Sequence, residues 1–329
     1  MTKSIAKSVA ALAVMIAVAG CGVSRPGTKA VLVPLGPISV ITSVDQITRP
    51  IDAYVPTVTD INKLTKGMDI VQARCMKGFN LPYQSEEIDG LAQDVLDYIA
   101  RTPLYGYFGT DTQLDKGYDM MRNPSAADNS ASVPQVAVNV FNGKNSAGTL
   151  ITSYQGKKVP PGGCQGAGAA AVGGFPPMPT TEVLPDGGPR TPASDPRLVA
   201  IYAKWAQCMK TKGYGYSTPM AAFLDPQWQP HSAAEFQDYT VSPVQIATVT
   251  ADLDCKKSTN LIGVAIAVES AYDNQYIKSH KTQLAKFQMQ LDARVAKAEQ
   301  IIAGNSNATE RRRLPGHAGT GPATGGSGH

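Results

Sequence analysis

The sequence has little net charge and, after its first 21 residues, no long apolar run. Its 30 basic and 26 acidic side chains leave a formal net charge of +4 over 329 residues. Proteins that bind nucleic acid through electrostatics carry a clustered basic face, so we expect no nucleic-acid partner. No later run reaches the ~18 apolar residues that a membrane-spanning helix needs. We therefore expect no spanning helix beyond the N-terminus.

Motifs for catalysis are also missing after residue 21. The chain has no G-x-S-x-G elbow, no H-E-x-x-H helix and no S-x-x-K serine signature there. Asp252, Asp254 and Glu269 could act as an acid–base pair, but their spacing equally fits carboxylates on a helix surface. We predict that the protein is not an enzyme. The four histidines lie outside any recognisable motif: His231, His280, His317 and His329.

Residues 159–192 are rich in Gly, Pro and Ala, which raises the question of a phosphate-binding loop. A P-loop needs G-x-x-x-x-G-K-[ST], and no Lys-Ser or Lys-Thr follows these glycines. They also lack the strand–turn–helix frame of a dinucleotide site. We therefore predict no cofactor here. We interpret the segment as a loop pinned by Cys164, followed by an interdomain linker.

The N-terminus carries the most specific motif of the chain. Lys3 and Lys7 precede an apolar run, Val9–Ala19, that ends in Val18-Ala19-Gly20-Cys21. This resembles the bacterial lipobox, which is cut before a cysteine whose thiol receives diacylglycerol. The resemblance implies a signal peptide over 1–20, lipidation of Cys21 and anchoring on the outer face of the cell membrane, since two or more acyl chains anchor stably. An ordinary secretory signal with a chance cysteine is the alternative.

Removal of residues 1–20 from the 329-residue chain would leave 309 residues with a net charge of +2, because Lys3 and Lys7 are lost. Four further cysteines remain, namely Cys75, Cys164, Cys208 and Cys255. An even number in an exported chain indicates two disulfides, for which three pairings exist. No pair has C-x-x-C spacing, so we expect neither a metal site nor a redox motif.

The part before the linker shows one clear helix and several weaker elements. Apolar residues at spacings of three and four predict a helix over 58–77, capped by Thr59 or Asp60 and stopped by a left-handed Gly78. A second helix is predicted over 86–100. Residues 105–108 are predicted to form an aromatic turn. Residues 135–141 are predicted as a helix or a strand, with the helix favoured, and residues 149–154 as a strand.

The part after the linker is predicted to be helical. Ser194-Asp195-Pro196 starts a helix that runs to about Lys212, followed by a second aromatic turn at 214–216. The aromatic turns either stack on sugars or peptides or seal a core. From Pro243 to Ile302 only Gly263 interrupts a helical pattern, which predicts one long helix or two broken near 258–263. The apolar stripe of 284–302 has near-heptad spacing and packs on its own domain or forms a coiled coil or partner-facing arm.

Two motifs of the second half resemble a group of actinobacterial lipoproteins of unknown function. The motifs are W-x-x-C-M-x-x-x-G-Y at Trp205–Tyr214 and D-x-x-C at Asp252–Cys255. The resemblance brings no known activity with it. On this footing, and because each cysteine then lies within one proposed half, Cys208 is expected to pair with Cys255 and Cys75 with Cys164.

We therefore predict a mainly α-helical protein with Gly/Pro-rich loops, few short strands, two disulfide-linked halves and a long C-terminal helix. The predicted function is non-enzymatic binding by a lipid-anchored envelope protein, with the membrane and a protein or cell-wall component as partners, the latter through the C-terminal helix. A transporter's solute-binding receptor and a cell-wall hydrolase are the alternatives. The boundaries are 1–20 signal peptide, 21–58 anchor and extended tether, 59–171 first half, 172–193 linker, 194–303 second half and 304–329 disordered tail.

Overall fold

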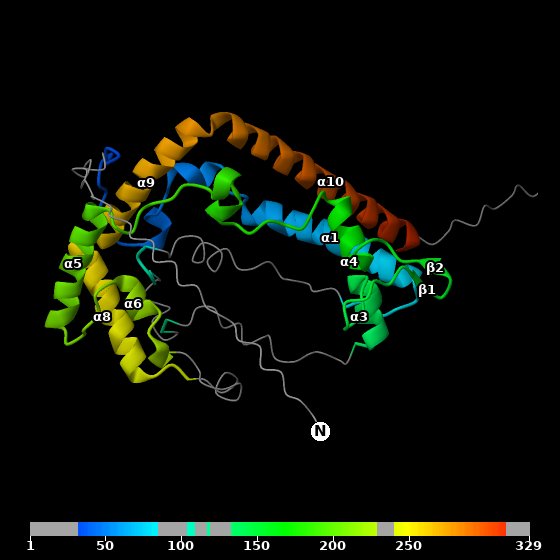
Figure 1. Cartoon of the computed structure of the whole chain (residues 1–329), viewed down its shortest axis with the longest axis horizontal. Coiled ribbons are helices and arrows are strands. Elements are labelled where there is room, and N and C mark those ends of the chain that lie inside the picture. The colour runs from blue at the N-terminus through cyan, green and yellow to red at the C-terminus, as the bar shows by residue number, and fades with distance from the viewer. Residues whose placement is uncertain (1–31, 85–103, 109–116, 119–132, 229–239, 314–329) are drawn as a thin grey trace, which may run out of the picture. The chain divides into compact units, whose positions relative to one another are not determined.

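The structure is a computed structural model that describes residues 32–84, 104–108, 117–118, 133–228 and 240–313, with side chains to residue 306. The described residues from Val33 onward belong to one compact unit. The described residues are mainly helical, with 61% helix and 3% strand, which confirms the predicted fold class (Figure 1). The signal peptide, Cys21 and the helix predicted over 86–100 lie outside the described residues.

Helix α1 (Val58–Gly78) confirms the first predicted helix, but its ends differ from the prediction. Thr57 is the cap, because its hydroxyl accepts a hydrogen bond from the Asp60 amide at 3.1 Å and the Asp60 carboxylate bonds back to Thr57. The left-handed residue that stops the helix is Asn80 rather than Gly78. The amide of Leu81 then bonds to the carbonyl of Met76 at 3.1 Å, which closes the last turn.

Helices α3 (Gln135–Asn142) and α4 (Gly163–Ala171) pack together, and both pack on α1. The helix favoured over 135–141 is confirmed. The strand predicted over 149–154 is reduced to β1 (Ser153–Tyr154), which pairs antiparallel with β2 (Lys157–Lys158). The loop predicted around Cys164 is wrong, because the segment forms α4. A Cβ on Gly168 would lie 2.6 Å from Gln72 Cγ, so small residues let α4 approach α1 closely.

A second helical cluster contains α5 (Pro196–Thr211), α6 (Pro219–Phe223), α8 (Pro243–Thr259) and α9 (Leu261–Ser279). The predicted starts of α5 and α8 are confirmed, since Asp195 and Ser242 cap them and a proline follows each. Helix α8 ends at Asn260, which has a left-handed backbone, and α9 begins at the next residue. Of the two alternatives, one long helix or two helices broken near 258–263, the second is therefore the one present.

Helix α10 (Lys281–Arg313) follows a second break at His280 that the sequence did not reveal. It packs along α1 (Figure 1) and buries Leu284, Leu291 and Ala298. Its apolar stripe therefore packs within its own chain, which was one of the two expectations. Because α10 continues to Arg313, the predicted disordered tail does not begin at residue 304.

Two segments predicted as tether and linker are packed against helices instead. Ile41, Ile47 and Ile51 are buried, so the extended tether predicted to reach residue 58 does not describe residues 41–58. Val172 and Leu184 are likewise buried in the segment predicted as a linker. Apolar side chains along both segments explain the difference. Short 3-10 turns lie in these segments and after α6: Val44–Gln46, Pro50–Ala53, Thr181–Val183, Pro185–Gly187 and Pro226–Trp228.

Candidate binding pocket

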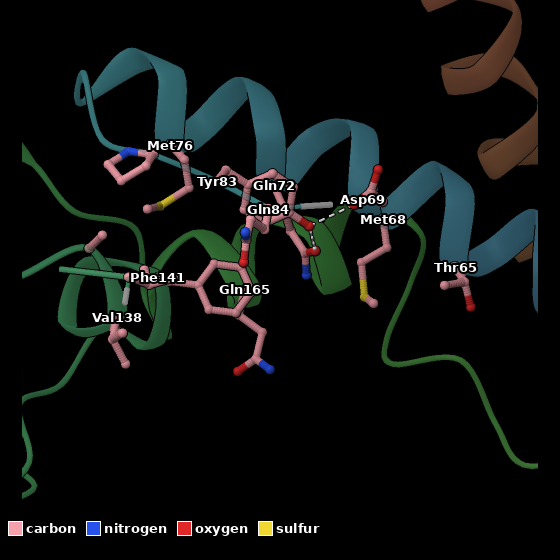
Figure 2. A pocket seen from close by; sticks show the side chains of 13 residues that line it. Thr65, Met68, Asp69, Gln72, Met76, Tyr83, Gln84, Val138, Phe141 and Gln165 are labelled. Atoms are coloured by element: carbon pink, nitrogen blue, oxygen red, sulfur yellow. Dashed lines mark hydrogen bonds between the residues drawn. The ribbon is translucent and has the colours of Figure 1, made fainter. Parts of the chain in front are cut away.

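A pocket lies between α1, α3, α4 and the chain that follows α1 (Figure 2). Its volume is about 350 Å³, which falls in the range of about 300–1,000 Å³ that is usual for small-molecule sites. Apolar side chains, amides, hydroxyls and one carboxylate line it. The lining residues are Thr65, Met68, Asp69, Gln72, Met76, Pro82, Tyr83, Gln84, Val133, Ala137, Val138, Phe141 and Gln165.

Helix α1 supplies one wall of this pocket through residues three and four positions apart. Thr65, Asp69, Gln72 and Met76 follow this spacing and so lie on one face of the helix. The turn at Asn80 then reverses the chain and brings the next residues back toward that face. The hydrogen bond from the Leu81 amide to the Met76 carbonyl, which closes the last turn of α1, therefore positions the second wall of the pocket.

Tyr83 connects the two walls through its hydroxyl and its ring. The hydroxyl oxygen lies 2.7 Å from Asp69 Oδ1 and 2.8 Å from the side-chain amide of Gln72 (Figure 2). A phenol has only one proton to donate, and the carboxylate is the stronger acceptor. Asp69 Oδ1 and Gln72 Oε1 therefore share the single proton that Tyr83 donates. The Tyr83 ring packs 5.8 Å from the ring of Phe141, measured between centroids.

The disulfide between Cys75 and Cys164 fixes the wall that α4 contributes. Its two Cα atoms are 5.5 Å apart, and it confirms the expected pairing. Each cysteine precedes a lining residue, Met76 on α1 and Gln165 on α4. The covalent bond therefore holds these two sides of the pocket at a constant spacing, and a preformed site loses less entropy when a ligand binds.

The pocket carries a negative formal charge among its lining residues. Asp69 is their one charged side chain, and none of the thirteen is Lys, Arg or His. The described residues also contain no group of three or more His, Cys, Asp or Glu side chains that would hold a metal ion. The methionine, valine and phenylalanine side chains of this lining suit a molecule with an apolar body.

The carboxylates considered as an acid–base pair are not brought together. Asp252 is fully buried, where it accepts hydrogen bonds from Trp205 Nε1 at 3.0 Å and Lys256 Nζ at 2.7 Å. Burial raises the pKa of Asp252 and lowers the pKa of Lys256, against the attraction between the two charges. Asp254 instead pairs with Lys212 at the surface, at 3.1 Å. Each of these two carboxylates thus has its own cation.

Glu269 belongs to a different buried cluster, together with Asp273 one turn later on α9. Arg49 reaches both carboxylates, with Nη1 3.2 Å from Glu269 Oε1 and Nη2 2.6 Å from Asp273 Oδ1. The two acidic side chains are 7% and 0% exposed. A substrate would have to displace Arg49 to reach them, so the geometry favours a structural clamp over an acid–base site.

The aromatic turns and the second pair of cysteines are structural. Tyr105, Tyr107 and Phe108 are buried in the core formed with α5, α8 and α9, which confirms the core-sealing alternative for the first turn. The second turn, 214–216, is partly buried against the same core. Cys208 bonds to Cys255, as expected, and joins α5 to α8.

Comparison with protein-family models, with curated proteins and with solved structures found no match to this chain. Within the described ranges, no helix combines the length and the apolar character that a membrane span requires.

The pocket residues were not singled out from the sequence. The signal was nevertheless present in C-M-K-G-F-N-L-P-Y, which holds Met76, Pro82 and Tyr83. Two polar residues, Asp69 and Gln72, also stand beside the apolar positions of α1. A polar residue on a buried helical face predicts a specific partner, which here is Tyr83.

Proposed function

We propose that this protein is a lipid-anchored, non-enzymatic binding protein of the cell envelope that takes a small, largely apolar molecule between α1, α3 and α4. The observation that carries the binding role is the pocket of about 350 Å³, which has one disulfide across its α1 and α4 walls. The anchor rests on the Val18-Ala19-Gly20-Cys21 motif. The two parts of the proposal are tested separately.

The packed C-terminal helix bears on how a partner would be recognised. Leu284, Leu291 and Ala298 face the chain's own core rather than solvent. A protein or cell-wall partner on α10 would therefore have to use its outer, polar side. This makes the pocket the better-supported recognition site.

Binding is tested with the full chain in lipid nanodiscs and the apolar fluorescent probe N-phenyl-1-naphthylamine. Val138→Trp places a large side chain in the pocket and should abolish the saturable part of the fluorescence increase. The matched control is Val136→Trp, which adds the same group at an exposed position two residues away that does not line the pocket. Equal saturable binding by both variants, or no saturable binding by the unmodified chain, would reject the pocket as a binding site.

The anchor is tested by growing cells with an alkyne fatty acid and detecting label on the protein. Label should be present on the unmodified chain and absent from Cys21→Ser. The variant should also lose its partition into the detergent phase of Triton X-114. Retention of label by Cys21→Ser would contradict lipidation at this residue, whatever the outcome of the pocket experiment.

A further inference from the structure

Basic residues gather at the C-terminal ends of α1 and α10, and none of them lines the pocket. The two helices run in the same direction. Gly67 lies against Ala298, and farther along both helices Arg74 Nη2 donates to Asn305 Oδ1 at 3.0 Å. The C-terminal ends of α1 and α10 therefore lie beside each other (Figure 1).

The hairpin of β1 and β2 is attached to the same end of α1. The ring of Tyr154 packs edge-on against that of Phe79, the residue after α1, with the ring centroids 6.2 Å apart. Lys157 Nζ donates to the carbonyl of Gly78, the last residue of α1, at 2.6 Å. A cation at this position also meets the negative end of the helix dipole. The hairpin thus adds its lysines to the basic residues of α1.

The segments that meet here are basic in sequence. Residues 70–78 hold two basic side chains and no acidic one, residues 133–181 hold three lysines and no acidic residue, and residues 300–313 hold three arginines and one glutamate. The arginines, at positions 311–313, continue α10 beyond Asn305. We give the name basic end to four exposed residues of these segments, namely Arg74, Lys77, Lys157 and Lys158.

An exposed apolar side chain accompanies the lysines. Leu150 is 74% exposed, and its backbone pairs with that of Lys144, shortly before β1 begins. Surfaces that lie in a membrane interface combine basic side chains with apolar side chains that enter the headgroup region. The hairpin and the loop before it have both kinds of side chain.

An anionic lipid surface is the partner that fits this combination. Each Lys or Arg near such a surface strengthens binding by about fivefold. The proposed lipidation of Cys21 would bring the chain to a membrane, and the choice of lipid over other polyanions rests on that proposal. Val33, where the folded unit begins, follows Cys21 by 12 residues. Such a tether spans at most about 43 Å and holds the folded unit at an effective concentration on the order of millimolar near the lipid.

We propose that the basic end binds the anionic phospholipids of the membrane as a second contact, besides the lipid on Cys21. The three lysines and Arg74 supply the attraction, and Leu150 enters the headgroup region. The contact turns the C-terminal ends of α1 and α10 toward the membrane. It weakens at high salt, because salt screens exposed charges.

The experiment places the full chain on vesicles of phosphatidylcholine, alone or mixed with phosphatidylglycerol, and measures the acetylation rate of each lysine by mass spectrometry. Phosphatidylglycerol should slow the acetylation of Lys77, Lys157 and Lys158 by on the order of tenfold at low salt. High salt should remove this protection. Lys204 and Lys210, which are exposed on α5, should react at equal rates on both kinds of vesicle.

Two double variants test whether the basic end causes this protection, with Lys157 as the reporter in both. Lys77→Gln with Lys158→Gln should bring the acetylation rates of Lys157 on the two kinds of vesicle to within about twofold of each other. Lys204→Gln with Lys210→Gln removes the same charge from α5 and should leave the protection of Lys157 unchanged. Circular dichroism checks that both proteins are folded.

Each outcome decides between the two proposals. A chain that does not float with phosphatidylcholine vesicles rejects the anchor; the basic end is then supported if the chain floats with phosphatidylglycerol vesicles and rejected if it does not. Equal acetylation of Lys157 on both kinds of vesicle rejects the basic end as a lipid contact, and so does protection that persists unchanged in Lys77→Gln with Lys158→Gln. Protection that appears only when soluble polyglutamate is added assigns the lysines to an anionic polymer and rejects the lipid surface.

Discussion

Replacing Glu269 with Gln should stabilise the protein at and above neutral pH. Glu269 Oε1 lies 3.2 Å from Arg49, while Oε2 is buried without a hydrogen-bond partner in the described part of the chain. Arg49 makes its shorter bonds, 2.9 and 2.6 Å, with Asp273. Burial raises the pKa of Glu269 from 4.5 to about 7, opposed by Arg49 and assisted by Asp273 and Asp52. Burial and the charge of Glu269 raise the pKa of Tyr202 on α5 to about 12.

The direction of the pH effect follows from these two pKa values. Below pH about 4.5 Glu269 is protonated in both the folded and the unfolded chain, so folding carries no ionisation cost. Between about 4.5 and 7 the unfolded chain loses the proton and the folded chain keeps it, so stability falls as pH rises. At about 1.4 kcal/mol for each pKa unit, the total loss above pH 7 is about 3 kcal/mol.

The assay is urea unfolding from pH 4.5 to 8, followed by the fluorescence of the buried Trp205 and Trp228. The free energy of unfolding of Glu269→Gln, minus that of the unmodified chain, should increase by about 3 kcal/mol over this range. Glu299→Gln is the matched control, because Glu299 is 52% exposed and pairs with Lys63 at the surface. A difference for Glu269→Gln that stays constant with pH would refute the reasoning, since the carboxylate would then titrate alike in both states.

Three further tests concern the packing around the site and the second core. Gly168→Val should lower the free energy of unfolding by about 1–3 kcal/mol, because its Cβ would lie 2.9 Å from a backbone carbonyl oxygen of α1. Gly78→Ala is the control and should leave the free energy of unfolding unchanged, because its Cβ would meet open space. Asp252→Asn should cost about 3–5 kcal/mol in urea unfolding, since it leaves a buried lysine without its counter-charge. The double change Cys75→Ser and Cys164→Ser should lower the free energy of unfolding by about 4–5 kcal/mol, because the disulfide closes a loop with a sequence separation of 89 residues. It should also weaken probe binding. Unchanged thermal unfolding of this variant would contradict the prediction.

The features that could be predicted from the sequence are those that a short stretch determines by itself. Asp195-Pro196 and Ser242-Pro243 start helices because the cap and the fixed proline backbone act within one turn. A break near Asn260 was one of two alternatives, because only Gly263 interrupts the helical pattern there. The break at His280 has no such signal, and the structure gives it a tertiary setting: the His280 ring stacks on Tyr276 and contacts Asp186.

The α4 wall of the pocket could not be predicted in the same way. Glycine lowers helix propensity, so a stretch with Gly163, Gly166 and Gly168 reads locally as a loop. The structure shows that tertiary packing overrides this preference, because the helix lies so close to α1 that Gly168 leaves no room for a Cβ. Propensity is a property of the isolated segment, whereas this contact needs α1, which is remote in sequence. The pocket could not be predicted for the same reason, because four separate segments of the chain form it.

The same reasoning changes what the two disulfides mean for the fold. Each joins cysteines within one proposed half, 59–171 or 194–303, which suggested two separately folded parts. Yet α1 of the first half is covered by α10, most of which belongs to the second, and a Cβ on Gly67 would lie 2.9 Å from Ala298 Cβ. A contact this close needs both partners in place before either face is protected from water. The cysteines therefore mark covalent connections, whereas the packing makes one unit from Val33 onward, with α1 contacting α10 on one side and the pocket on another.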